Sequence, residues 1–169
     1  MAAESISACM NRGRVGWLVV MLLIVGCEGT SSSTTMPTSQ QAEISGRIFH
    51  WELACTDQTR YQGLSDRKEI PADGGMLFVF PQPRKLTFVM RRCLTPIDVI
   101  FLDAAGNVDS WHEMPVEPYA FTDEQLKLYH SDWPCQFAVE LRGGTVRELH
   151  LKVGQKLVLP WANIKRLAK

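Results

Sequence analysis

The sequence predicts a mainly β fold of the α+β class: a compact, antiparallel, barrel-like or sandwich-like single domain with short helices. Short apolar runs rich in β-branched and aromatic residues recur between Gly and Pro residues, as at Met76–Phe80 and Ile97–Asp103. Helical patterns are few and short, which favours packed short strands over a helical bundle. The composition, 46% hydrophobic and 21% charged, is ordinary for a globular protein.

Residues 1–26 are predicted to be an export signal. Arg12 and Arg14 precede an unbroken apolar run, Val15–Gly26, which ends on a small residue. The run is shorter than the roughly 20 residues that a membrane-spanning helix needs, so a permanent transmembrane helix is the less favoured interpretation. The two arginines would stand at the very N-terminus if translation began at Met10; Met1 and Met10 both stay open as start sites.

The end of this signal, Ile24-Val25-Gly26-Cys27, resembles the lipobox of bacterial lipoproteins. The resemblance implies cleavage before Cys27 and a diacylglyceryl group on its sulfur; an ordinary signal peptide followed by a chance cysteine is the alternative. Two or three acyl chains anchor a protein stably, whereas one chain does not. We therefore expect an exported protein, attached to the membrane through lipid on Cys27, on the periplasmic or outer-membrane side of the cell envelope. Glu28 after the anchor favours the outer membrane weakly.

Residues 27–42 are predicted to be a flexible tether, and residues 43–169 the folded domain. The tether is dominated by Ser, Thr and Gln without a hydrophobic period, so it cannot bury enough surface to fold. The full chain has a formal charge of zero and no basic cluster interleaved with aromatic residues, which argues against nucleic-acid binding.

The first half of the domain is predicted to alternate strands with one short helix. Loose alternation and aromatic residues indicate a strand, and the pair Thr56-Asp57 can cap a helix after it. A Pro-rich link then joins two apolar runs, which suggests a hairpin-like turn. These elements are a strand at 44–54, a helix at 58–64, and strands at 76–80 and 86–90 joined through 81–84.

The second half is predicted to begin with a clear hairpin and to end with short strands and helical turns. Ala104-Ala105-Gly106-Asn107 is the expected turn between strands at 97–103 and 108–114. Thr122 opens a capping-type sequence that suggests another helix. The remaining elements are helices at 122–129 and 145–149 and strands at 137–141 and 157–159.

Five stretches of the domain resemble the domain-of-unknown-function family 192, also called uncharacterised protein family 0127. They occur in the order of the family and cover about Glu43 to Pro160. Val89, Cys93 and Gln155 depart from the usual residues, which are tryptophan, asparagine or threonine, and aspartate. The resemblance implies a small β-rich fold, often secreted or membrane-attached, and no established activity. The matching stretches are Thr59–Arg67, Gly75–Phe80, Phe88–Met90, Pro96–Asp103 and Glu140–Gly144.

Three charged residues stand at polar positions of this family within otherwise apolar stretches: Arg60, Asp98 and Glu140. A buried charge is costly unless it is paired. One interpretation is a cleft in which Arg60 binds an anionic group while Asp98 or Glu140 acts as acid or base. The plainer interpretations place both carboxylates on the solvent side, or pair Arg60 with one of them to lock the helix onto the sheet.

The cysteines and histidines suggest no metal or cofactor chemistry. After Cys27 the chain has Cys55, Cys93 and Cys135, and we expect a Cys93–Cys135 disulfide with one free thiol left over. The four histidines lack zinc-ligand spacing, and the double glycines are not followed by the residues of a phosphate-binding loop. We therefore expect neither a metal nor a cofactor.

The function is left open between three hypotheses. We prefer a non-enzymatic envelope module that binds a polysaccharide or an envelope protein, because no nucleophile–base pair or metal set emerges. An envelope hydrolase using Asp98 and Glu140 is the second hypothesis; it requires both carboxyl groups in one cleft. A purely structural lipoprotein without a pocket is the third.

Overall fold

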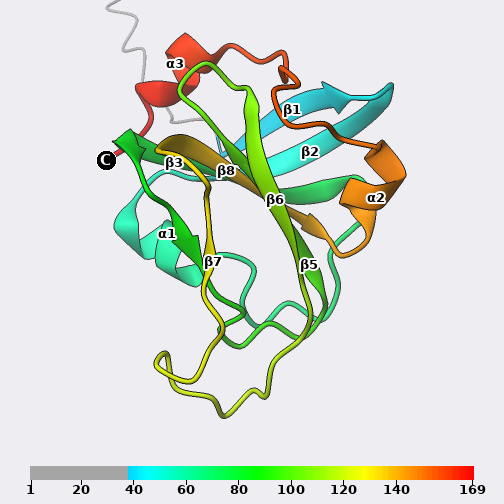
Figure 1. Cartoon of the computed structure of the whole chain (residues 1–169), viewed down its shortest axis with the longest axis vertical. Coiled ribbons are helices and arrows are strands. Elements are labelled where there is room, and N and C mark those ends of the chain that lie inside the picture. The colour runs from blue at the N-terminus through cyan, green and yellow to red at the C-terminus, as the bar shows by residue number, and fades with distance from the viewer. Residues whose placement is uncertain (1–37) are drawn as a thin grey trace, which may run out of the picture. The chain divides into compact units, whose positions relative to one another are not determined.

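The computed structural model describes residues 38–169, which form a mixed six-stranded sheet, a two-stranded sheet and three short helices. The strand order of the large sheet is β1-β2-β3-β8-β5-β6 (Figure 1). β2 and β3 are parallel, and every other neighbouring pair is antiparallel. The strands are β1 (Ser39–Ile44), β2 (Arg47–Ala54), β3 (Gly74–Arg84), β4 (Thr87–Phe88), β5 (Ile97–Leu102), β6 (Val108–Met114), β7 (Tyr129–His130) and β8 (Cys135–Arg142); the helices are α1 (Asp57–Gln62), α2 (Thr145–Leu149) and α3 (Trp161–Lys165).

The large sheet is buried on both faces, so the domain is sandwich-like. Because successive side chains of a strand point to opposite faces, each inner strand supplies two separate cores. One core packs the sheet against α2 and α3, with Val146, Leu149 and Trp161 among its members. The other packs it against β4, β7 and the segment after α1, with Leu64, Phe88 and Tyr129. This explains why β5 and most of β8 are buried without alternation.

The predicted β-rich fold with short helices is confirmed, as are several of its elements. α1 begins with Thr56 as its N-cap, and Thr56 and Thr59 exchange the reciprocal bonds of a capping box. β5 and β6 form the expected antiparallel hairpin. Its turn is held by the Asp103 carboxylate, which accepts hydrogen bonds from the backbone N–H groups of Ala105 and Asn107.

The sheet differs from the expectation in three respects. It has two edges, β1 and β6, rather than closing as a barrel, and its β2–β3 pair is parallel rather than antiparallel. The predicted strand 44–54 is the second arm of a hairpin whose first arm, β1, begins inside the predicted tether. Ser45 and Gly46 both have positive φ, which makes the tight turn between the two arms.

The predicted hairpin between 76–80 and 86–90 does not form. β3 instead continues through its prolines to Arg84, and it pairs with β2 and β8. The register against β8 shifts between Val79 and Arg84, where the amide Nε2 of Gln136 donates to the main-chain oxygens of Phe80 and Pro81, both at 3.2 Å. Where the prolines interrupt the ladder, a side-chain amide thus satisfies two main-chain acceptors of β3.

Two further local predictions are wrong. Residues 122–129 form a turn and the start of β7, because the Thr122–Gln125 bonds close one turn that is not continued. Residues 157–159 form no strand; an isolated bridge joins Asn107 to Lys156 instead. The helix α3, which follows Pro160, was not predicted. The described helices have five or six residues, and none of them is long and apolar enough to cross a membrane. The predicted signal 1–26 and Cys27 lie outside the described residues.

The contact between the β5–β6 turn and α3 gives a testable prediction. Gly106 and Gly154 have nearly equal positive φ, +83° and +79°. A Cβ added at Gly106 would lie 2.0 Å from the indole Nε1 of Trp161, whereas a Cβ added at Gly154 would lie in open space. Replacing either by Ala costs about 1–2 kcal/mol for the left-handed backbone. Gly106→Ala should lower the free energy of unfolding by about 1–3 kcal/mol more than Gly154→Ala, because the ring must move. Equal losses in urea denaturation would contradict this packing.

Candidate functional site

Of the three charged residues singled out by the sequence, Arg60 and Glu140 line one cleft, whereas Asp98 lies on the other face of the sheet. In the β5–β8 register Asp98 lies opposite Leu141, and Glu140 lies opposite Val99. Since register partners share a face and successive residues alternate, Asp98 and Glu140 point to opposite faces of the sheet. The expectation that both carboxyl groups act in a single cleft is therefore not met.

Asp98 is buried and holds the start of α2. Its Oδ2 accepts a hydrogen bond of 2.8 Å from the backbone N–H of Val146. Burial raises the pKa of Asp98, and the backbone N–H groups of Val146 and Gly144 act against this rise. A buried carboxyl group that accepts from a helix start satisfies backbone donors that would otherwise be orphaned. Asp98 therefore connects β5 to α2.

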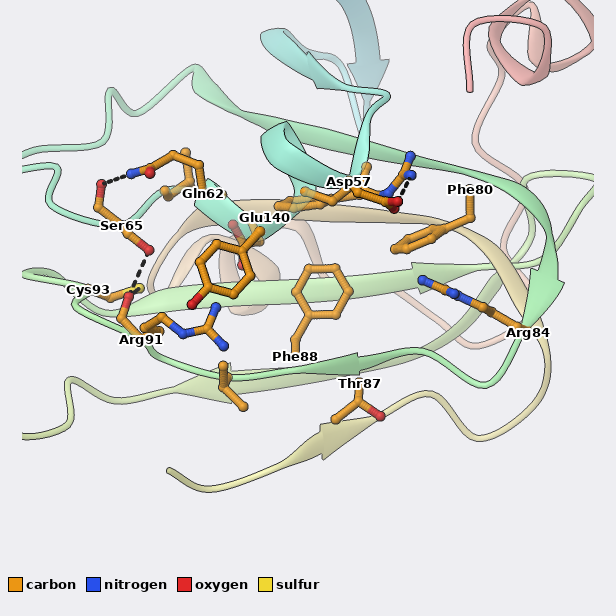
Figure 2. Close-up of a pocket in the computed structure, with 16 residues that line it drawn as sticks. Asp57, Gln62, Ser65, Phe80, Arg84, Thr87, Phe88, Arg91, Cys93 and Glu140 are labelled. Carbon is orange, nitrogen blue, oxygen red and sulfur yellow. Dashed lines mark hydrogen bonds and ion pairs between the residues drawn. The ribbon is translucent and has the colours of Figure 1, made fainter. Parts of the chain in front are cut away.

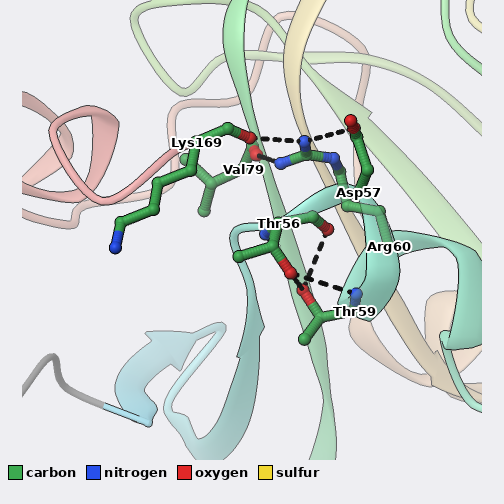
Figure 3. A network of polar contacts seen from close by, with 6 residues as sticks. All are labelled: Thr56, Asp57, Thr59, Arg60, Val79 and Lys169. Atoms are coloured by element: carbon green, nitrogen blue, oxygen red, sulfur yellow. Dashed lines mark hydrogen bonds and ion pairs between the residues drawn. The ribbon is translucent and has the colours of Figure 1, made fainter.

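Arg60 is also engaged inside the fold (Figure 3). Its side chain is 8% exposed, and Nη1 donates to the main-chain oxygen of Val79 at 2.7 Å. Nη2 donates to the Asp57 carboxylate at 2.7 Å and to the main-chain oxygen of Lys169 at 2.8 Å. Arg60 thus ties α1 to β3 and to the C-terminal segment. This agrees with the plainer expectation of a locking residue, although its partners are not the two predicted carboxylates.

Glu140 is the unusual group of the structure. It lies in the middle of the sheet, on β8 between Met76 of β3 and Val99 of β5, and it is only 4% exposed. Its Oε2 has no hydrogen-bond partner within residues 38–169. Burial raises the pKa of Glu140 to about 8, against the opposing effects of the Leu64 N–H and the Arg67 charge. Near neutral pH the group is therefore mostly a protonated acid, which can donate a hydrogen bond.

Glu140 lies at the back of a cleft of about 380 Å³ between α1, the segment after it, the end of β3 and the β4 segment (Figure 2). The aromatic rings of Phe78 and Phe88 meet edge to face, with 4.8 Å between their centroids. Gly63 lies next to the carboxyl group: a Cβ there would make ordinary van der Waals contacts of 3.5 Å with both Oε2 and Phe78. The other lining residues are Asp57, Arg60, Tyr61, Gln62, Leu64, Ser65, Phe80, Arg84, Thr87, Val89, Arg91 and Cys93.

Sequence reasoning found Glu140 but missed the cations of the cleft, Arg84 and Arg91. Arg84 stacks over the Phe80 ring, with its Cζ 4.8 Å from the centroid, and Arg91 stacks over Tyr61 at 4.1 Å. The only signal in the sequence is that each arginine follows an apolar run, Arg91 directly and Arg84 after three residues, which is too common a pattern to single them out.

The cysteines carry no disulfide within the described chain. Cys55, Cys93 and Cys135 are all free thiols, so the expected Cys93–Cys135 bridge is not formed. Cys93 lines the cleft, whereas Cys135 is buried in the core at the start of β8. Burial raises the pKa of both thiols to about 12, so both remain protonated and unreactive near neutral pH. Residues 38–169 contain no group of three or more His, Cys, Asp or Glu that could hold a metal ion.

The fold and cleft define a small β-rich domain with a buried acid behind an open, arginine-flanked cleft. The chain belongs to the domain-of-unknown-function family 192, described as an uncharacterised ACR, which it matches over residues 39–159. No curated protein matches the sequence.

Two solved structures are similar to this chain. One is a protein of unknown function from Novosphingobium aromaticivorans DSM 12444, with 28% identity and a TM-score of 0.61, matched over 72% of this chain and 83% of that one. The other is a proposed transcription regulator from Sinorhizobium meliloti 1021, with 29% identity and a TM-score of 0.58, matched over 71% of this chain and 90% of that one. The family resemblance seen in the sequence is thus confirmed, and the biochemical function remains unknown.

The raised pKa of Glu140 predicts an unusual dependence of stability on pH. Above about pH 4.5 the unfolded chain loses this proton, whereas the folded chain keeps it until about pH 8. The folded state then binds more protons, so the Glu140 contribution to the free energy of unfolding falls by up to about 1.4 kcal/mol per pH unit in this window. Glu140→Gln should remove this decline, as measured by urea denaturation from pH 4 to 9.

Glu113→Gln is the matched control. The Arg147 guanidinium lowers the pKa of Glu113, so its contribution to stability is present above the ordinary carboxyl pKa and is lost only below it. The control should keep the decline between pH 4.5 and 8. Parallel pH profiles for the parent protein and Glu140→Gln would show that Glu140 ionises normally, contrary to this description.

Proposed function

We propose that this chain is a lipid-anchored protein of the cell envelope whose cleft binds a ligand without transforming it. The observation that carries the binding proposal is the Glu140 carboxyl group, buried behind the cleft with Oε2 unpaired. A buried polar atom without a partner lowers stability, and such atoms are rare in folded proteins unless they serve a function or meet a water molecule. A ligand oxygen at the back of the cleft would supply the missing partner.

The anchor proposal rests on the sequence. The short apolar run that ends in Gly26-Cys27 has the length and exit of a lipoprotein signal. The domain of family 192 begins at residue 39, so residues 28–38 are available as a spacer between the lipid and the fold. Attachment to a membrane would place the cleft within reach of cell-wall or exported polysaccharides, or of another envelope protein.

Binding is favoured over hydrolysis by the content of the cleft. Asp98 lies on the other face of the sheet, and Asp57, which lines the cleft with Glu140, is held in its ion pair with Arg60. Glu140 therefore has no free second carboxyl group of the kind that a two-carboxylate hydrolase needs. No histidine occurs among the lining residues, and the raised pKa of Cys93 leaves its thiol a poor nucleophile. The Sinorhizobium neighbour is named as a regulator of transcription, but the balanced charge of this chain gives no support for a nucleic-acid partner.

The anchor is tested by the variant Cys27→Ser in the full chain. Loss of the only lipid-accepting thiol should move the protein from the membrane fraction to the soluble or unprocessed fraction, with loss of labelling by a radioactive fatty acid. Cys55→Ser, which leaves Cys27 in place, should behave as the parent protein does. Unchanged membrane association of Cys27→Ser would refute the anchor.

The cleft is tested by filling it. Val89 lines the cleft and is partly buried, whereas Val153 is exposed outside it. We expect at least one of N-acetylglucosamine, N-acetylmuramic acid, galactose and galacturonic acid to raise the Tm of the parent protein and of Val153→Trp by several degrees, since a ligand that binds only the folded state stabilises it. Val89→Trp should abolish the shift. No shift with any sugar would favour the purely structural lipoprotein, and an undiminished shift in Val89→Trp would place binding elsewhere.

A further inference from the structure

Two arginines reach into the space in front of Phe88 from opposite sides of the cleft (Figure 2). Arg84 projects from the end of β3, is exposed, and makes no ion pair with a carboxylate of the described chain. Arg91 lies on the far side, and part of its guanidinium group is already used in an ion pair, because Nε and Nη2 donate to the Asp123 carboxylate at 2.6 and 2.7 Å. Arg84 is therefore a free cation, and Nη1 of Arg91 stays outside its ion pair.

The charge around the cleft favours an anion. Three arginines, Arg60, Arg84 and Arg91, contribute positive charge to the cleft. The carboxylates of Asp57 and Asp123 balance part of it, and both are already used in ion pairs. Three other acidic groups also have partners already. Asp66 pairs with Arg92, Glu52 pairs with Arg67, and Glu117 accepts a hydrogen bond from the backbone N–H of Lys127. The Arg84 side of the cleft consequently keeps an unbalanced positive charge.

The floor between the arginines and Glu140 is apolar and aromatic. Phe78 and Phe88 are buried at 2% and 8% exposure, and together with Phe80 they form a wall of ring edges and faces. A flat or ring-shaped body can pack on such a wall. Behind it, protonated Glu140 can donate to an oxygen of the ligand. A ligand with an ammonium group would instead have to approach past three guanidinium groups.

We propose that the cleft recognises a ring-bearing carboxylate, with its carboxylate at Arg84, its ring over Phe88, and an uncharged oxygen at Glu140. This inference rests on the proposed binding function and specifies its ligand. Arginine suits the role because its planar guanidinium presents paired donors to a carboxylate. Acidic sugars and aromatic acids share this chemistry, and they are distinguished by experiment.

The test is calorimetric titration of the full chain in detergent with two matched pairs of probes: galacturonate and galactose, and benzoate and benzyl alcohol. Within at least one pair we expect the carboxylate to bind at least tenfold more tightly than its neutral partner. Arg84→Gln should weaken the carboxylate at least fivefold and leave the neutral probe unchanged. Arg166→Gln, an exposed arginine outside the cleft, is the matched control and should bind as the parent protein does.

A second pair of variants tests the donor at the back. Glu140→Gln keeps an N–H donor and should retain binding. Glu140→Met keeps the side-chain length without the donor, and it should weaken the binding of the preferred carboxylate and of its neutral partner to the same extent. A preference for galacturonate identifies an acidic sugar, and one for benzoate an aromatic acid. Equal affinity for charged and neutral probes would overturn this inference while leaving the cleft a binding site. Binding of none of the four probes would overturn both this inference and a ring-shaped ligand for the cleft.

Discussion

Burial of the Glu140 carboxyl group is the constraint on which the cleft depends. β8 is hydrogen-bonded on both sides, by β3 and β5, and the segment after α1 covers Glu140 on its face of the sheet. An ionised carboxylate enclosed in this way would cost several kcal/mol, and the rise of its pKa to about 8 keeps the group neutral instead. The protein thus carries a hydrogen-bond donor in a wall that is otherwise made of phenylalanine rings and aliphatic side chains.

The cost of burying the other two charged residues is offset by hydrogen bonds to groups within the domain. Asp98 accepts from the backbone at the start of α2, and Arg60 donates to two main-chain oxygens and to Asp57. Both therefore stabilise contacts between elements, although Asp98 Oδ1 and Arg60 Nε also lack a hydrogen-bond partner within the described chain. Only Glu140 combines burial, an unpaired oxygen and a place on the cleft, so polar residues that look alike in the sequence have different roles in the fold.

The predictions from the sequence are confirmed where a local pattern determines the structure, and they are wrong where pairing between distant segments determines it. The cap at Thr56 and the turn held by Asp103 are local, and both form as expected. The parallel pairing of β2 with β3 and the passage of β3 through its prolines depend on residues more than 20 positions away, and no local pattern encodes them. The resemblance to family 192 identified Asp98 and Glu140 as polar positions within otherwise apolar stretches. Their opposite faces follow only from the β5–β8 register, which the sequence does not reveal.

The chain is a family 192 domain with a neutral acid behind an arginine-flanked cleft, and its character depends on the protonation of Glu140 near neutral pH. The most direct measurement is a ¹³C NMR titration of the side-chain carboxyl carbons, with Glu140 assigned by its absence in Glu140→Gln. A resonance that titrates with a midpoint near 8 would confirm the buried acid. Titration of Glu140 near 4.5, as in an exposed glutamate, would contradict it and with it the assignment of the cleft.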